Sequence, residues 1–177
     1  MVKQGRKTAR REKPEFDQKL LDLARVTRVV KGGRRFRFRA TLVIGNRKGK
    51  VGVGVAKGAD VSGAIQKAYN DAKKNLVTIK LNGATISHDI TFKMGASKVL
   101  LRPAPAGRGI IAGGAVRAVV DLLGVKDIVS KSLGASNPIN VARATVKALE
   151  GLKAPRLPKI AQETAVVARS AESGVEL

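Results

Sequence analysis

The chain has 177 residues, of which 44% are hydrophobic, enough to bury a core in one large or two small domains. Its 35 Lys and Arg residues against 13 Asp and Glu residues give a formal charge of +22, which indicates a polyanionic partner and favours nucleic acid. The absence of Cys excludes disulfides, thiolate metal sites and a Cys nucleophile.

The positive charge is concentrated in the first third of the chain. Eighteen basic and four acidic residues lie between positions 1 and 57, a net charge of +14, so we expect the partner to bind there. No uncharged apolar run is long enough to span a membrane, and no apolar segment follows the N-terminal charges as in a secretory signal. These features predict a cytoplasmic chain, while the Arg/Lys-rich stretch 3–11 leaves an organelle transit peptide open.

The first half predicts a β-β-β-α order. Residues 1–14 carry six basic side chains and almost no large apolar residue, which predicts a basic arm that is disordered until it binds. Strands are expected at 21–30, 35–44 and 51–56, because apolar residues there run together or alternate. Apolar residues at helical spacing over 61–76 then predict a helix that covers the sheet.

The strand at 35–44 alternates between two kinds of side chain. One face holds an apolar set, namely Phe36, Phe38, Ala40, Leu42 and Ile44. The other face begins with three arginines. Because Phe36 and Phe38 share a face with Leu42 and Ile44, we expect both rings in the core rather than stacked on RNA bases. In the next strand Gly52 and Gly54 leave one face nearly bare, which predicts close packing against it.

The second half alternates strands and helices, as in a small α/β unit. Strands are predicted at 86–92, 98–102 and 127–133, with a glycine loop at 107–114 and a helix at 115–123. A final helix is predicted from Asn137 as N-cap, with Pro138 at the first helical position and Gly151 at the end. Residues 153–177 are interpreted as a tail.

The segment 25–39 is the strongest candidate for binding nucleic acid. Seven cations flank a two-glycine turn, with no acid among them, and the glycines let the backbone approach a groove closely. Since aromatic residues make up only 3% of the chain, we expect phosphate and sugar contacts to dominate. The predicted RNA-binding residues of this segment are Arg25, Arg28, Lys31, Gly32, Gly33, Arg34, Arg35 and Arg37. Four cations that follow the segment are predicted to bind RNA as well, namely Arg47, Lys48, Lys50 and Lys57.

The sequence gives little support to an enzyme. The loop at 107–114 lies between a strand and a helix, with Asp127 at the distance of a ribose-binding acid, so nucleotide binding stays open as an alternative. Its spacing is G-x-G-x-x-x-G and no phosphate-binding Lys follows, so Arg108 and Arg117 suit a protein contact better. His88 stands alone, and we expect no catalytic residue, no metal site and no cofactor.

Five motifs resemble one known family, the bacterial form of small-subunit ribosomal protein S-five, over roughly residues 15–152. They are VKGGRRFRF at 30–38, GKVGVGVAKG at 49–58, AIQKA at 64–68, RPAPAGRGIIAGGAVRAV at 102–119 and SNPINVARAT at 136–145. The resemblance implies an α+β protein of two small domains. The first, at 15–80, is like the double-stranded-RNA-binding domain without its first helix, and the second, at 81–152, is a βαβ-type sandwich with a left-handed crossover.

The resemblance also implies partners. These are 16S-type ribosomal RNA near the junction of body and head, messenger RNA near the tunnel by which it enters, and ribosomal proteins S-four and S-eight. The loop of Val26, Thr27, Arg28, Lys31, Gly32 and Gly33 is expected to reach the head RNA. The contact with S-four, which tunes decoding accuracy, maps to Gly107, Arg108, Gly109 and Arg117. A free double-stranded-RNA-binding regulator and a nucleotide-binding enzyme are the alternative functions.

Overall fold

The first half of the chain forms a four-stranded antiparallel sheet in the order β1-β2-β3-β4, seen in a computed structural model that describes residues 15–153. Its strands are β1 (Asp17–Val30), β2 (Gly33–Gly45), β3 (Lys50–Gly58) and β4 (Leu76–Thr78), with helix α1 (Val61–Lys74) between the last two. The predicted β-β-β-α order is confirmed. The helix ends before Leu76, because that residue pairs with Gly52 as the start of β4, which the sequence pattern did not predict.

Helix α1 lies directly on the glycines of β3. A side chain at Gly54 would meet the backbone of Ala68 and Ala72, and one at Gly52 would lie 2.5 Å from the carbonyl oxygen of Ala72. The buried alanines of α1 pack in turn against Ala40, Leu42 and Ile44 of β2. The nearly bare face predicted for β3 is therefore the place where the helix approaches most closely.

The second half forms another four-stranded sheet, in the order β5-β6-β8-β7. Its elements are β5 (Ile90–Met94), β6 (Ser97–Pro103), β7 (Ile110–Ile111), α2 (Gly114–Leu123), β8 (Ile128–Gly134) and α3 (Pro138–Glu150). The strand predicted from residue 86 begins only at Ile90, because Ile86 is buried in the preceding loop rather than paired. Asn137 caps α3 as predicted, accepting a hydrogen bond from the Ile139 amide at 3.1 Å.

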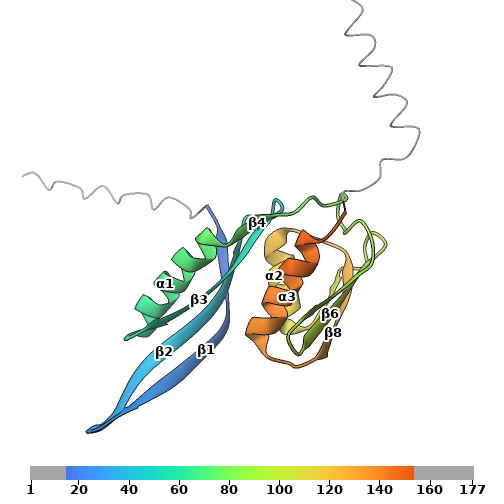
Figure 1. Cartoon of the computed structure of the whole chain (residues 1–177). Helices are drawn as coiled ribbons and strands as arrows, with labels where there is room; N and C mark the ends of the chain where they lie inside the picture. Colours follow the sequence, from blue (N-terminus) through green and yellow to red (C-terminus); the bar gives the residue numbers. More distant parts are fainter. Residues whose placement is uncertain (1–14, 154–177) are drawn as a thin grey trace, which may run out of the picture.

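Helices α2 and α3 lie between the two sheets (Figure 1). One core joins valines of the first sheet, Val43, Val51 and Val53, to buried side chains of both helices and of β6 and β8. The first sheet is thus covered on both faces, by α1 on one side and by α2 and α3 on the other. The second sheet is covered by helices on one face only.

The turn between β2 and β3 joins the two halves by hydrogen bonds. The amides of Arg47 and Gly49 donate to the carbonyl oxygens of Leu122 and Leu123, at 2.9 and 3.0 Å, at the C-terminal end of α2. Carbonyls in the last turn of a helix have no partner within the helix, so this turn satisfies two of them. Gly124, with a φ of 97°, ends the helix where the Arg47 backbone leaves no room for a side chain.

Candidate nucleic-acid interface

The β1–β2 hairpin projects from the body of the protein (Figure 1). Strand β3 pairs with β2 only between Gly45 and Phe38, so the segment beyond Phe38 is a ribbon of two strands without a third. A turn of Lys31 and Gly32 closes it, and Gly33, the first residue of β2, has the left-handed φ of 143° that favours glycine. Within the part of the chain that the structure describes, no helix or third strand covers either face of this ribbon.

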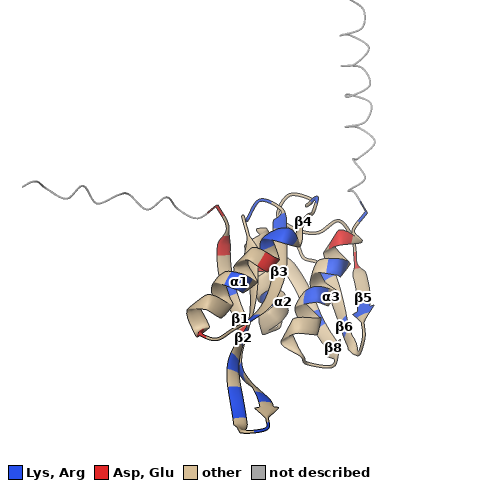
Figure 2. Ribbon diagram, turned by 60° about the vertical axis from the view of Figure 1, so that its left-hand side comes forward, with Lys and Arg blue, Asp and Glu red and all other residues tan. Residues whose placement is uncertain are grey.

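The projecting ribbon carries most of the predicted RNA-binding cations (Figure 2). Directly opposite residues share a face, so Arg28, Arg35 and Arg37 lie on the face turned away from α1, whereas Arg25 and Arg34 lie on the α1 face. Arg28 is directly opposite Arg35. Like charges on directly opposite residues destabilise a sheet, and an anion bound between the two arginines would remove this repulsion.

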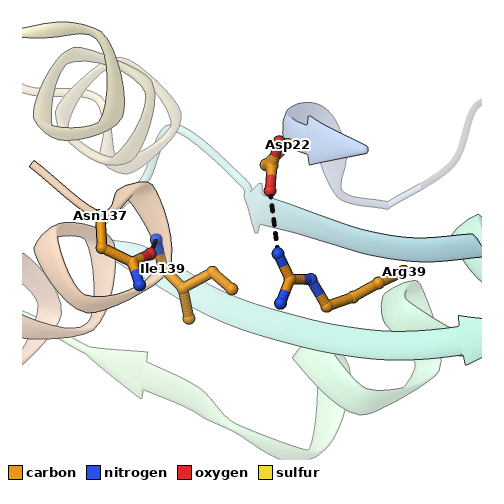
Figure 3. Close-up of polar contacts among 4 residues, drawn as sticks. All are labelled: Asp22, Arg39, Asn137 and Ile139. Atoms are coloured by element: carbon orange, nitrogen blue, oxygen red, sulfur yellow. Dashed lines mark hydrogen bonds and ion pairs between the residues drawn. The ribbon is translucent and has the colours of Figure 1, made fainter. Parts of the chain in front are cut away.

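Acidic partners are scarce along the hairpin. Arg39 pairs with Asp22, with Nη2 at 3.5 Å from Oδ2 (Figure 3). Within residues 15–153, none of the six cations between positions 25 and 37 forms an ion pair. Lys57 of β3 lies directly opposite Arg39 and extends the cationic face toward the body of the protein. Charge on this face is therefore available to phosphates.

Phe36 contradicts one prediction. It is 46% exposed and belongs to neither core cluster, whereas Phe38 is half-buried against the cluster under α1. Phe36 does lie on the same face as Phe38, but β3 pairs with β2 no further than Phe38, so neither β3 nor the cluster under α1 extends to the Phe36 ring. The guanidinium carbon of Arg25 lies 3.6 Å from the centroid of the Phe36 ring.

The structure separates three predicted RNA-binding cations from the hairpin. Arg47, Lys48 and Lys50 lie at the β2–β3 turn, at the opposite end of a strand of 13 residues, roughly 40 Å from the hairpin tip. Arg47 pairs with Asp17, its Nε 3.1 Å from Oδ2, and the turn backbone is bonded to α2. These cations do not form one site with the ribbon.

The sequence interpretation missed a second group of cations. Residues of β6 alternate between the buried Val99 and Leu101 and an outer face turned away from the helices. Four exposed cations share that outer face, namely Lys93, Lys98, Arg102 and Lys131. Only the cross-strand register shows that they belong together, because the sequence spreads them over three strands.

The glycine loop is fixed from within the protein. Asp127 is only 5% exposed, and its Oδ1 accepts a hydrogen bond from the Gly109 amide at 2.8 Å. Arg117 donates to the carbonyl oxygen of Ile110 at 2.7 Å, and Ile110 begins β7, a strand that was not predicted. Because Asp127 holds the loop, it is not available as the ribose-binding acid of a nucleotide site.

The described residues also bear on metal binding and on membrane insertion. Among residues 15–153, no group of three His, Cys, Asp or Glu residues is arranged to hold a metal ion. None of the helices described has the length and apolar character that crossing a membrane requires.

Comparison with known proteins decides the family. The models "Ribosomal protein S5, N-terminal domain" and "Ribosomal protein S5, C-terminal domain" match residues 16–80 and 92–164. The chain belongs to the ribosomal protein S5 family. Relatives named small ribosomal subunit protein uS5, from Campylobacter jejuni strains 81-176, 81116 and RM1221, are each 56% identical over 139 residues, covering 78% of this chain and 95% of theirs.

Membership in the ribosomal protein S5 family confirms the resemblance seen in the motifs. The chain is a ribosomal protein of the small subunit, active in translation, and not an enzyme. Binding to ribosomal RNA is general in this family, and its place in the cell is the ribosome, which is cytoplasmic in bacteria.

Proposed function

We propose that the β1–β2 hairpin is the main element by which this chain holds the ribosomal RNA of the small subunit. The observation that carries the proposal is the unpaired cationic ribbon at residues 25–37, with Arg28 directly opposite Arg35. Phosphates placed along this ribbon would relieve the repulsion and release counterions from the RNA. Because both faces are open, the ribbon can insert between RNA segments and contact them on either side.

A salt series tests the proposal. Each phosphate neutralised on duplex contributes about 0.9 to the slope of log affinity against log salt. Replacing Arg28, Lys31 and Arg34 together by Ala should lower the affinity for small-subunit RNA and reduce that slope, measured by filter binding between about 50 and 200 mM salt.

A matched variant controls for net charge. Replacing Lys73, Lys74 and Lys80 by Ala removes the same number of exposed charges from a part of the protein away from the hairpin. It should change the slope much less. An equal loss of slope in both triple variants would assign binding to net charge, and an unchanged slope in the hairpin variant would place the hairpin off the RNA.

The finer location rests on the family resemblance. The proposed site is 16S-type RNA near the junction of body and head, beside the path of the messenger RNA. Residues 15–80 form the proposed RNA-binding domain, which is similar to the double-stranded-RNA-binding domain. Residues 81–152 form the proposed second domain, a βαβ-type sandwich with a left-handed crossover connection. The basic arm 1–14 and the tail beyond position 153 lie outside the described residues and carry no part of this proposal.

The loop around Gly107, Arg108 and Gly109, with Arg117, is the proposed contact with protein S-four, and S-eight is a second proposed neighbour. Open space around Gly107, Gly109, Gly113 and Gly114 supports a surface that a neighbour can approach closely, since an added Cβ at any of them meets no atom within 4 Å. This contact biases a rearrangement of the subunit, so losing about 1 to 2 kcal/mol there changes the populations roughly five- to thirty-fold.

Two substitutions in this loop separate the interface from the fold. Gly109 has a φ of 75°, so a side chain there strains the loop, whereas Gly113 has a φ of −67° that any residue adopts. Gly113→Arg should therefore leave the isolated protein folded, yet loosen S-four and alter misreading in assembled ribosomes. Gly113→Ser, a small polar control, should change misreading less. Wild-type readthrough with Gly113→Arg would contradict the proposed interface.

A further inference from the structure

Phe36 is the one aromatic residue that the fold leaves exposed. The chain has four Phe and one Tyr, all within the described residues. Phe16 is buried under α1, Phe38 and Tyr69 pack against the same cluster, and Phe92 packs against the core between the sheets. Phe36 belongs to neither cluster, although the strand that carries it continues directly into the core. Among residues 15–153, its ring is therefore available to a binding partner.

The surroundings hold the Phe36 ring in a defined position. Thr27, a β-branched residue, is directly opposite it in β1, and the Arg25 guanidinium lies over the ring at 3.6 Å from the centroid. Val29, which is 75% exposed, shares the same face nearer the hairpin tip. A planar cation thus covers part of an aromatic ring at the edge of a cationic ribbon.

The chemistry of this arrangement suits an unpaired nucleobase. Bases that leave a helix stack on aromatic rings and on guanidinium planes, and a guanidinium between a ring and a base interacts favourably with both. A purely apolar protein partner would leave Arg25 and Arg34 unneutralised on this face, where the ribbon offers no acid. An RNA partner supplies a base for the stacked pair and phosphates for the cations.

We propose that Arg25 and Phe36 form a stacking platform for one unpaired base of RNA, while Arg28, Arg35 and Arg37 on the opposite face bind phosphates. The inference rests on the proposed function, and it adds the kind of RNA that the hairpin selects. The preferred RNA contains a bulge, loop or junction rather than a continuous duplex.

Two RNA probes and the full-length chain test the platform. One probe is a duplex of about 16 base pairs, and the other is the same duplex with one bulged 2-aminopurine. The wild-type chain should prefer the bulged probe, and stacking should quench the 2-aminopurine fluorescence. Phe36→Leu should weaken binding to the bulged probe roughly 5- to 100-fold. Binding to the paired duplex and the salt slope should change little, because no phosphate contact is lost.

Conservative variants separate stacking from folding. Phe36→Tyr keeps an aromatic ring and should keep both the preference and the quenching. Arg25→Lys keeps the charge but removes the plane, so it should lose much of the preference while keeping the salt slope. These variants also show whether any effect of Phe36→Leu comes from a damaged hairpin.

The outcomes distinguish failure of the platform from failure of the proposed function. Salt-dependent binding without preference for the bulged probe, or with a preference that Phe36→Leu keeps, would overturn the platform and leave the RNA-binding hairpin standing. Release of a ribosomal protein by Phe36→Leu, with RNA preference unchanged, would assign this face to a protein and also overturn it. Absence of salt-dependent binding to small-subunit RNA by the wild type would contradict the proposed function itself.

Discussion

Gly54 of β3 shows how a single residue sets the distance between helix and sheet. A Cβ there would meet the carbonyl oxygen of Ala68 and lie 2.5 Å from the amide nitrogen of Ala72. These are backbone atoms, which cannot move aside as the end of a flexible side chain can. The close approach allows small residues of α1 to be fully buried, namely Ala64, Ala68 and Ala72.

Gly54→Ala should therefore destabilise the protein. Forcing one methyl group into this contact should lower the free energy of unfolding by about 1 to 3 kcal/mol, measured by urea denaturation. Gly63→Ala is the matched control, since it adds the same methyl group in α1 where no atom lies within 4 Å. That change should stabilise by about 0.5 to 1 kcal/mol, because Ala favours a helix over Gly. Equal stability of Gly54→Ala and wild type would contradict the packing.

At the scale of elements, the β1–β2 hairpin has features that suit the proposed RNA binding but lower its own stability. A two-stranded ribbon in water is marginally stable, and this one also places Arg28 directly opposite Arg35. Elements of this kind fold because the adjoining sheet supports them, here the part of β2 that pairs with β3. The capped helix α3, with Asn137 bonded to the Ile139 amide, is by contrast stabilised locally (Figure 3).

Removing one member of the like-charged pair should stabilise the free protein. Arg35→Thr replaces a repelled cation by a good strand former, and should raise the melting temperature at low salt by roughly 1 to 3 °C. Arg37→Thr is the control, because the same charge is lost opposite the uncharged Val26. Both variants should bind RNA more weakly. The proposed repulsion would be wrong if the two melting temperatures changed equally.

At the scale of the whole molecule, the two sheets share one core. Val43, Val51 and Val53 of the first sheet are buried against α2 and α3, and the turn at 46–49 is bonded to the end of α2. Exposing three valines costs roughly 5 to 9 kcal/mol. That is comparable to the total stability of about 5 to 15 kcal/mol of a typical domain.

The fragment 15–80 alone should consequently lack a stable fold. We expect the complete chain to unfold in one cooperative transition by calorimetry, and the fragment to show at most a broad transition at much lower temperature. Circular dichroism and amide hydrogen exchange measure the fragment directly. A fragment as stable as the complete chain, and equal to it in affinity for duplex RNA, would instead support a detachable RNA-binding module, as the alternative of a free regulator requires.

Much of the candidate site was visible in the sequence because charge patterning is local. Seven cations around Gly32 and Gly33 predicted both the hairpin and its partner class. The structure places six of them on the projecting ribbon and Arg39 at its base, opposite Lys57. The prediction that the Phe36 ring is buried in the core was wrong. Alternation tells which face a side chain occupies, but it does not tell where the covering helix ends.

The sequence by itself determined the β-β-β-α order of the first half, the basic hairpin and the family, since each depends on residues that are close in the chain. It did not predict the short strands β4 and β7. Only the tertiary structure decided which residues from distant segments share a surface. It separated Arg47 from the hairpin, assigned Asp127 to the Gly109 amide, and gathered four cations on the outer face of the second sheet. The physical reason is that strand register and helix packing depend on contacts between residues far apart in sequence, which a local pattern does not contain.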